Sequence, residues 1–323
     1  MKKDYPIFDT SRLNLLPLSE RRHDLDLSVI LPLASCEQNN DSLTTVAGRI
    51  VQARNHGAPV VLMMGAHVLR SGVQRYIIDL MEKGFISCIA MNGACAIHDY
   101  EFALIGKTTE NVSNYIRAGQ FGLWQETGHI NRIVKQASYE GIGLGEAVGR
   151  EIVQGDFPNK EISIFAAGYR LRVLLTVHVG IGYDIIHEHP DCDGAAYGAT
   201  SYRDFLRFAK IIESLQNGVI MNFGSAVMAP EIYLKALSMA RNVAIQNNRQ
   251  INNFTALVCD LYALPKNFHS QPSKQIAGYY FRPWKTMLVR TVADGGESYY
   301  VQAPHNRTIP ELWTAIQKIR GEE

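Results

Sequence analysis

The chain has 323 residues, of which 46% are hydrophobic and 20% charged, as is typical of a globular protein with a sizeable core. Its 32 basic and 31 acidic side chains nearly cancel, so the protein has no overall field to attract nucleic acid or an anionic membrane. No apolar run approaches the roughly 20 residues that span a bilayer, and the N-terminal residues lack the apolar stretch of a signal peptide, so we expect a cytoplasmic protein.

The first predicted segment is an N-terminal extension, residues 1–40, which we expect to wrap the surface or a neighbouring subunit. Residues 41–323 are predicted to form a single domain in which apolar strands alternate with amphipathic helices. The predicted strands are 59–64, 86–91, 173–180, 218–224 and 254–262, and the predicted helices are 42–56, 68–84, 202–215, 230–244 and a terminal helix with Pro310 in its first turn. This alternation predicts an α/β fold, a Rossmann-like and mostly parallel sheet with helices on both faces.

Three of the predicted strands end in similar turns, which read MGAHVLRSG (64–72), MNGACAIHD (91–99) and NFGSAVMAPE (222–231). Each turn pairs a glycine and small residues with the start of a helix, where free backbone amides favour a phosphate. Because ligands of such sheets bind outside the carboxyl ends of the strands, these turns predict a nucleotide crevice.

Another glycine-rich stretch, GIGLGEAVG (141–149), resembles a dinucleotide fingerprint. It follows a helix or loop pattern, whereas the fingerprint requires a preceding strand. We therefore expect its small residues to let a helix pack closely.

The stretch HEHPDCDG (187–194) contains two histidines and two carboxylates within eight positions. His187, His189, Asp191 and Asp193 form a ligand set that suits zinc or a similar ion, which would make the protein a metal-dependent hydrolase. The stretch also follows a predicted strand and precedes a predicted helix. We favour a loop beside the cofactor or substrate and keep the metal site as the alternative.

The turns at Gly65–Gly72, Asn92–Asp99, Asp193–Gly198 and Gly224–Glu231, in this order, resemble those of deoxyhypusine synthase, as does the closing YYVQAPHNRTIPELWTAI. The resemblance covers most of the chain from about residue 55. It implies a Rossmann-like fold that holds NAD at the subunit interfaces of a homotetramer. It also implies NAD-dependent transfer of the aminobutyl group of spermidine through an imine on an enzyme lysine.

Carried over by position, the resemblance implies a set of cofactor-binding residues, namely Gly65, Ser71, Gly72, Asn92, Gly93, Asp99, Asp193, Gly194, Gly224 and Ser225. The chain also departs from the family. His98 stands where the family has a glutamate, Pro230 replaces a histidine, and the acidic segment before the family's lysine is missing.

The predicted catalytic residues are Lys285, as the candidate imine lysine, and His187 and His189, as acid/base groups. The expected function is that of an NAD-dependent transferase acting on an amine such as spermidine. A non-catalytic cofactor-binding homologue is a further alternative.

Overall fold

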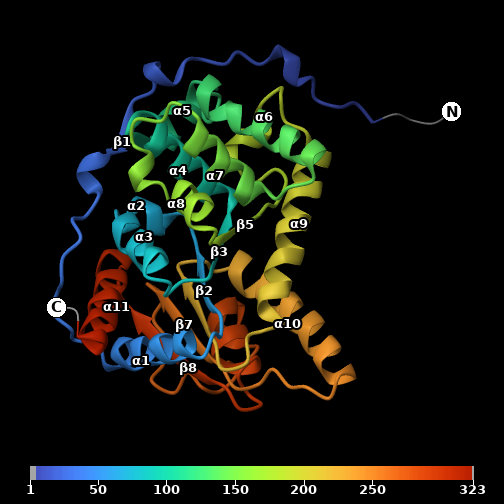
Figure 1. Cartoon of the computed structure of the whole chain (residues 1–323). Coiled ribbons are helices and arrows are strands. Elements are labelled where there is room, and N and C mark those ends of the chain that lie inside the picture. The colour runs from blue at the N-terminus through green and yellow to red at the C-terminus, as the bar shows by residue number, and fades with distance from the viewer. Residues whose placement is uncertain (1–4, 322–323) are drawn as a thin grey trace.

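A six-stranded parallel sheet forms the centre of the protein in the computed structural model, which describes residues 5–321 (Figure 1). The strands lie in the order β5-β3-β2-β6-β7-β8. Their bounds are β2 Val60–Met64, β3 Cys88–Asn92, β5 Leu174–His178, β6 Val219–Phe223, β7 Thr255–Asp260 and β8 Glu297–Gln302. Every residue of β2 and of β6 is buried, as expected for strands covered on both faces. The predicted fold class is therefore confirmed.

Helices cover both faces of the sheet, and the side chains of β2 divide between the two layers. Val60, Leu62 and Met64 belong to one hydrophobic cluster, while Val61 and Met63 belong to the other, because successive strand residues point to opposite faces. The first layer contains α1 (Asp41–Asn55), α3 (Gln74–Glu82), α4 (Gly93–Ile105) and α11 (His305–Arg320). The second contains α9 (Gly194–Ile212), α10 (Met228–Gln246) and the π-helix η7 (Pro283–Arg290).

A block of helices between β3 and β5 stands above the sheet in Figure 1. It contains α5 (Val112–Arg117), α6 (Gln125–Glu140), α7 (Leu144–Gln154) and α8 (Ile164–Leu171), with the short 3-10 turn η4 (Lys160–Ile162). A further 3-10 turn, η5 (Ile185–Glu188), follows β5. A Cβ on Gly145 would collide with the carbonyl of Leu175, and one on Gly149 with that of Phe165. The predicted close packing of GIGLGEAVG is therefore confirmed. None of the helices in residues 5–321 has the length and apolar character needed to cross a bilayer.

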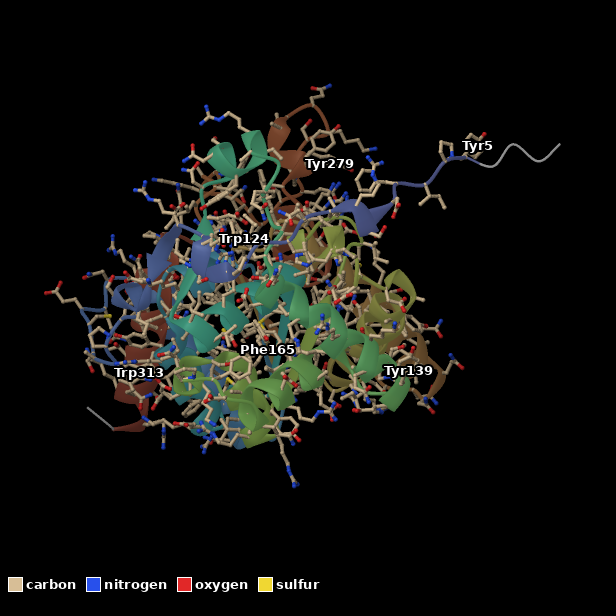
Figure 2. The ribbon with its side chains drawn as sticks, turned by 90° about the horizontal axis from the view of Figure 1, so that it is seen from above. Tyr5, Trp124, Tyr139, Phe165, Tyr279 and Trp313 are labelled. Carbon is tan, nitrogen blue, oxygen red and sulfur yellow. The ribbon has the colours of Figure 1, made fainter. Side chains whose placement is uncertain are left out.

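The N-terminal extension wraps the surface of its own chain, passing from the helical block down to α11 (Figure 1). Its strand β1 (His23–Asp26) pairs antiparallel with β4 (Lys107–Glu110), and its 3-10 turns are η1 (Thr10–Arg12), η2 (Leu18–Glu20) and η3 (Leu27–Val29). Further along, the Cys36 amide donates to Thr314 Oγ1 of α11. Only the first described residues leave the body, as Figure 2 shows for Tyr5.

Three predicted boundaries were wrong. The expected helix 68–84 is two helices, α2 (His67–Arg70) and α3, because the chain turns at Gly72 with φ +77° and packs there against the Val29 carbonyl. Helix α9 begins at Gly194 and not at residue 202. Helix α11 begins at His305, which places Pro310 in its second turn.

One more 3-10 turn, η6 (Ala277–Tyr280), precedes η7.

Candidate functional site

The candidate site lies at the point where the order in which strands are added to the sheet reverses. The chain first forms β2, adds β3 and β5 on one side, and then returns to place β6 on the other side of β2. In open α/β sheets, ligands bind in the crevice outside the carboxyl ends of the two strands at such a switch point. Here those two strands are β2, followed by Gly65, and β6, followed by Gly224.

The two turns at the switch point contact each other through their glycines. The Gly65 amide donates to the Phe223 carbonyl at 3.0 Å, and a Cβ on Gly65 would collide with the Gly224 carbonyl. Gly224 has φ +64°, and a Cβ there would collide with the ring of His305. A side chain at Gly65 would therefore force the two turns apart, and one at Gly224 would displace the His305 ring.

Backbone amides without protein acceptors gather at these turns. Within the described residues, the two turns leave the amides of Ala66 and His67 after β2, and of Ala226, Val227 and Met228 after β6, without a protein acceptor. Ser225 orders the second turn, because its amide donates to Asn222 Oδ1 and its Oγ accepts from the Ala229 amide. The two turns form an amide cradle that suits an anionic group such as a phosphate.

The neighbouring strand β3 ends beside the cradle. Asn92 caps α4 by accepting a hydrogen bond from the Cys95 amide at 3.3 Å. The next residue, Gly93, packs so closely against the Asp184 carboxylate that a Cβ would collide with it. Burial raises the pKa of Asp184 to about 6. Sequence reasoning gave Asp184 and His305 no role, because only the folded structure shows that they pack against Gly93 and Gly224.

Of the ten predicted cofactor residues, five lie at the carboxyl ends of three adjacent strands. They are Gly65, Asn92, Gly93, Gly224 and Ser225. Ser71 and Gly72 lie beyond them at the end of α2, where Gly72 packs on the N-terminal extension. Asp193 and Gly194 start α9, after the edge strand β5.

Asp99 lies away from this edge, and here the prediction needs a correction. Its side chain is 1% exposed and accepts hydrogen bonds from Ser163 Oγ and from the amides of Ile164 and Phe165. It therefore satisfies the free amides at the start of α8 and has no access to the crevice.

The four candidate ligand side chains of HEHPDCDG are each bonded within the protein, and among the described residues His187 Nε2 is the ring nitrogen of this stretch that is buried without a partner. His187 Nδ1 accepts from the amides of Gly182 and Asp184, and His189 Nε2 bonds the Gly122 carbonyl at 2.8 Å. Asp191 pairs with Arg132 at 2.9 Å, and Asp193 caps α9. In residues 5–321 no group of three His, Cys, Asp or Glu side chains is placed to hold a metal ion. The arrangement favours a structured loop over a metal cage.

Replacing Asp193 with alanine is expected to lower the free energy of unfolding by about 1 kcal/mol, because Asp193 Oδ1 accepts from the amides of Ala195 and Ala196. Urea denaturation measures the change, and Asp193→Asn is the matched control because its side-chain oxygen can still cap the helix. An unchanged stability in the alanine variant would contradict the capping role.

The three predicted catalytic side chains are not brought together. Lys285 lies on η7, with Nζ 3.8 Å from the ring centroid of Tyr279, and η7 packs on β7. His187 and His189 follow β5, which is four strand spacings from β7, or about 19 Å at about 4.8 Å per spacing.

Comparisons with known proteins support the fold. The sequence profile of the family described as "Arginine dihydrolase ArgZ-like, C-terminal, Rossmann fold" matches residues 44–156. A search of curated proteins finds no match.

Several solved structures match this chain at low sequence identity. The ternary complex of AgrE with ornithine and NAD+ has a TM-score of 0.51 at 12% identity, over 89% of this chain and 35% of AgrE. A protein assigned to the LOR/SDH group from Methanococcus maripaludis S2 has a TM-score of 0.51 at 12% identity, over 90% of this chain and 74% of its own. A protein assigned as a deoxyhypusine synthase from Entamoeba histolytica has a TM-score of 0.46 at 9% identity, over 86% and 87% of the two chains.

These matches establish a Rossmann fold and do not confirm the deoxyhypusine synthase family. The chain spans about a third of the ArgZ and AgrE chains that it matches, 32% and 35% of them respectively.

Proposed function

We propose that this protein binds NAD across the carboxyl ends of β2 and β6 and uses it in a redox reaction of a small amine. The observation that carries the proposal is the amide cradle of residues 66–67 and 226–228 at the switch point. Amides that lack protein acceptors fit the pyrophosphate of a dinucleotide, and the two glycines let the backbone approach it.

The choice of an amine is supported from two directions. AgrE was crystallised with ornithine and NAD+, and the sequence motifs resemble a family that oxidises spermidine. Both compounds are aliphatic amines. A transfer reaction through Lys285 has less support, because Lys285 lies on η7, which packs on β7, whereas the predicted acid/base groups follow β5, four strands away in the sheet.

When bound, NAD would supply a hydride acceptor for the carbon that bears the amine. The protein's own residues would bind and orient the two partners. The turns of Gly65 and Gly224 would hold the pyrophosphate through their amides. The half-buried Asp184 carboxylate, which packs against Gly93 at the start of α4, would attract the cationic amine. A cofactor-binding protein without turnover would retain the first role alone, so an assay of NADH formation separates it from the enzyme.

NAD is expected to stabilise the fold by about 2.7 kcal/mol at a hundredfold excess over its dissociation constant. Thermal unfolding with NAD, NADP and adenosine phosphates measures this effect. If none of these nucleotides shifts the transition of protein that is free of carried-over nucleotide, the proposal is wrong.

Replacing Ala226 with aspartate tests the cradle itself. Ala226 is exposed, so the fold should persist, but a carboxylate beside the free amides would repel a pyrophosphate. We expect at least about tenfold weaker NAD binding, and Ala199→Asp on the exposed face of α9 is the matched control. Equal NAD affinity in both variants would place the cofactor elsewhere.

A further inference from the structure

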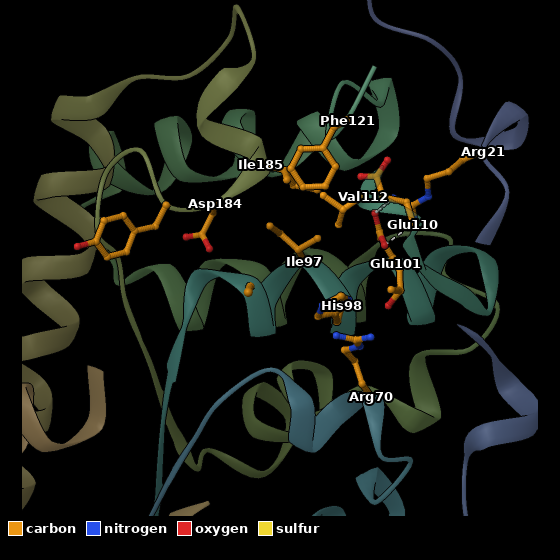
Figure 3. A pocket seen from close by; sticks show the side chains of 13 residues that line it. Arg21, Arg70, Ile97, His98, Glu101, Glu110, Val112, Phe121, Asp184 and Ile185 are labelled. Carbon is orange, nitrogen blue, oxygen red and sulfur yellow. Dashed lines mark hydrogen bonds and ion pairs between the residues drawn. The ribbon is translucent and has the colours of Figure 1, made fainter. Parts of the chain in front are cut away.

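A separate cavity of about 210 Å³ lies along α4, between α2, β4 and the loop that follows β5 (Figure 3). Its polar lining includes Arg70, His98, Thr109 and Asp184, and apolar side chains such as Ile97 and Ile185 form its walls. Ligand pockets for drug-sized molecules range from about 300 to 1,000 Å³, so this cavity suits a smaller molecule than a dinucleotide.

A chain of buried hydrogen bonds orients His98 in this cavity. Arg21 forms a bidentate salt bridge with Glu101, at 2.6 and 2.8 Å, and both side chains are 1% exposed. Burial opposes the ionisation of Glu101, but the bonds and charge of Arg21, with bonds from Thr108 and Thr127, outweigh it, so the pKa of Glu101 is lowered. Glu101 is therefore a carboxylate, and it accepts the Thr108 hydroxyl proton at 2.6 Å.

This chain of bonds determines the tautomer of His98. The single proton of the Thr108 hydroxyl is used on Glu101, so its oxygen accepts at 2.7 Å from His98 Nδ1, which must be protonated. Burial lowers the pKa of His98 to about 4, so the ring is neutral near pH 7. Its Nε2 then carries a lone pair, and it has no hydrogen-bond partner in the described part of the chain.

Two further groups that line the cavity have unused hydrogen-bonding capacity. Within residues 5–321, Arg70 Nε and Thr109 Oγ1 are buried without partners. Thr109 also has φ +67°, which is strained for a β-branched residue, and strain of this kind gathers at binding sites. Arg70 Nη1 contacts His67 Nε2 at 3.3 Å, so the cavity borders the turn after β2 that forms part of the amide cradle.

The polar groups lie at two ends of one apolar wall. Arg70, His98 and Thr109 are at one end, and Asp184 is at the other, against Gly93. Gly93 and His98 are five positions apart on α4, or about 7.5 Å along the helix at about 1.5 Å per residue. That separation matches a short aliphatic chain with a polar group at each end.

We infer that this cavity binds a diamino acid. Its carboxylate would pair with Arg70, its α-amine would donate to His98 Nε2, its aliphatic chain would lie on Ile97 and Ile185, and its terminal ammonium would pair with Asp184. The assignment of this ligand as the substrate rests on the proposed function, whereas its binding does not depend on NAD.

The test measures L-ornithine binding by calorimetry to the whole chain and to two variants. Asp184→Asn should weaken ornithine binding about tenfold or more but leave norvaline, which has the same chain without the terminal amine, nearly unaffected. Arg70→Gln should weaken the binding of both ligands. Arg170→Gln is the matched control, because Arg170 lies on α8 and forms an exposed ion pair with Glu82. It should change the binding of neither ligand.

The outcomes separate this inference from the proposed function, because NAD binding is measured on the same samples. Ornithine binding that neither variant weakens would overturn the inference, as would NAD binding without ornithine binding. Preferential binding of spermidine would also overturn it. Ornithine binding that depends on both residues, in protein that does not bind NAD, would support the cavity and contradict the proposed function.

Discussion

Replacing Arg21 with alanine is expected to lower the free energy of unfolding by about 3–5 kcal/mol, because the change leaves the Glu101 carboxylate buried without its charged partner. The guanidinium supplies both hydrogen bonds of the salt bridge, and Thr108 and Thr127 alone cannot neutralise the charge. Urea denaturation of the variant beside the unmutated protein measures the loss.

The adjacent Arg22→Ala is the matched control, since Arg22 is exposed and makes its hydrogen bond through its backbone amide. It should change stability by no more than about 0.5 kcal/mol. The double variant Arg21→Met, Glu101→Leu should recover most of the lost stability, because it removes both charges together. A small effect of Arg21→Ala would show that the extension is not anchored by this ion pair.

The importance of Arg21 illustrates where sequence reasoning is weak. Residues 1–40 have no place in the α/β pattern, yet Arg21 reaches Glu101 across 80 positions and so completes the hydrogen-bond chain to His98. No periodicity or motif in the sequence predicts a contact between residues so far apart in the chain. The relay and the strained Thr109 could be found only from the folded structure.

The layered fold was predictable because each strand is a continuous apolar run between helices, and parallel strands end at the same edge. From the sequence, that rule predicts that Gly65, Asn92 and Gly224 lie together, and they follow or end three adjacent strands of the sheet. It could not show which way a helical side chain points. Asp99 follows the second turn along the chain but lies on the side of α4 that faces α8.

Replacing Asp99 with alanine is expected to lower the free energy of unfolding by about 3 kcal/mol at pH 5, because three buried donors at the start of α8 lose their acceptor. Burial raises the pKa of Asp99 from its ordinary value of 3.8 to about 6 in the folded protein. The stability that Asp99 contributes is therefore complete below pH 3.8 and is lost as the pH rises through 6. The cost of the substitution should therefore shrink by about 1–2 kcal/mol between pH 5 and pH 8. Urea denaturation at the two pH values measures both effects.

Two comparisons distinguish this capping role from a role at the cofactor. Asp156→Ala, which removes an exposed carboxylate from the same helical block, should change stability by no more than about 0.5 kcal/mol. Ser163→Ala combined with Asp99→Ala should cost less than the sum of the single changes, because both remove the same hydrogen bond. If Asp99→Ala instead leaves the fold stable and abolishes stabilisation by NAD, then Asp99 acts at the cofactor, as the sequence resemblance implies, and the cap at α8 contributes little.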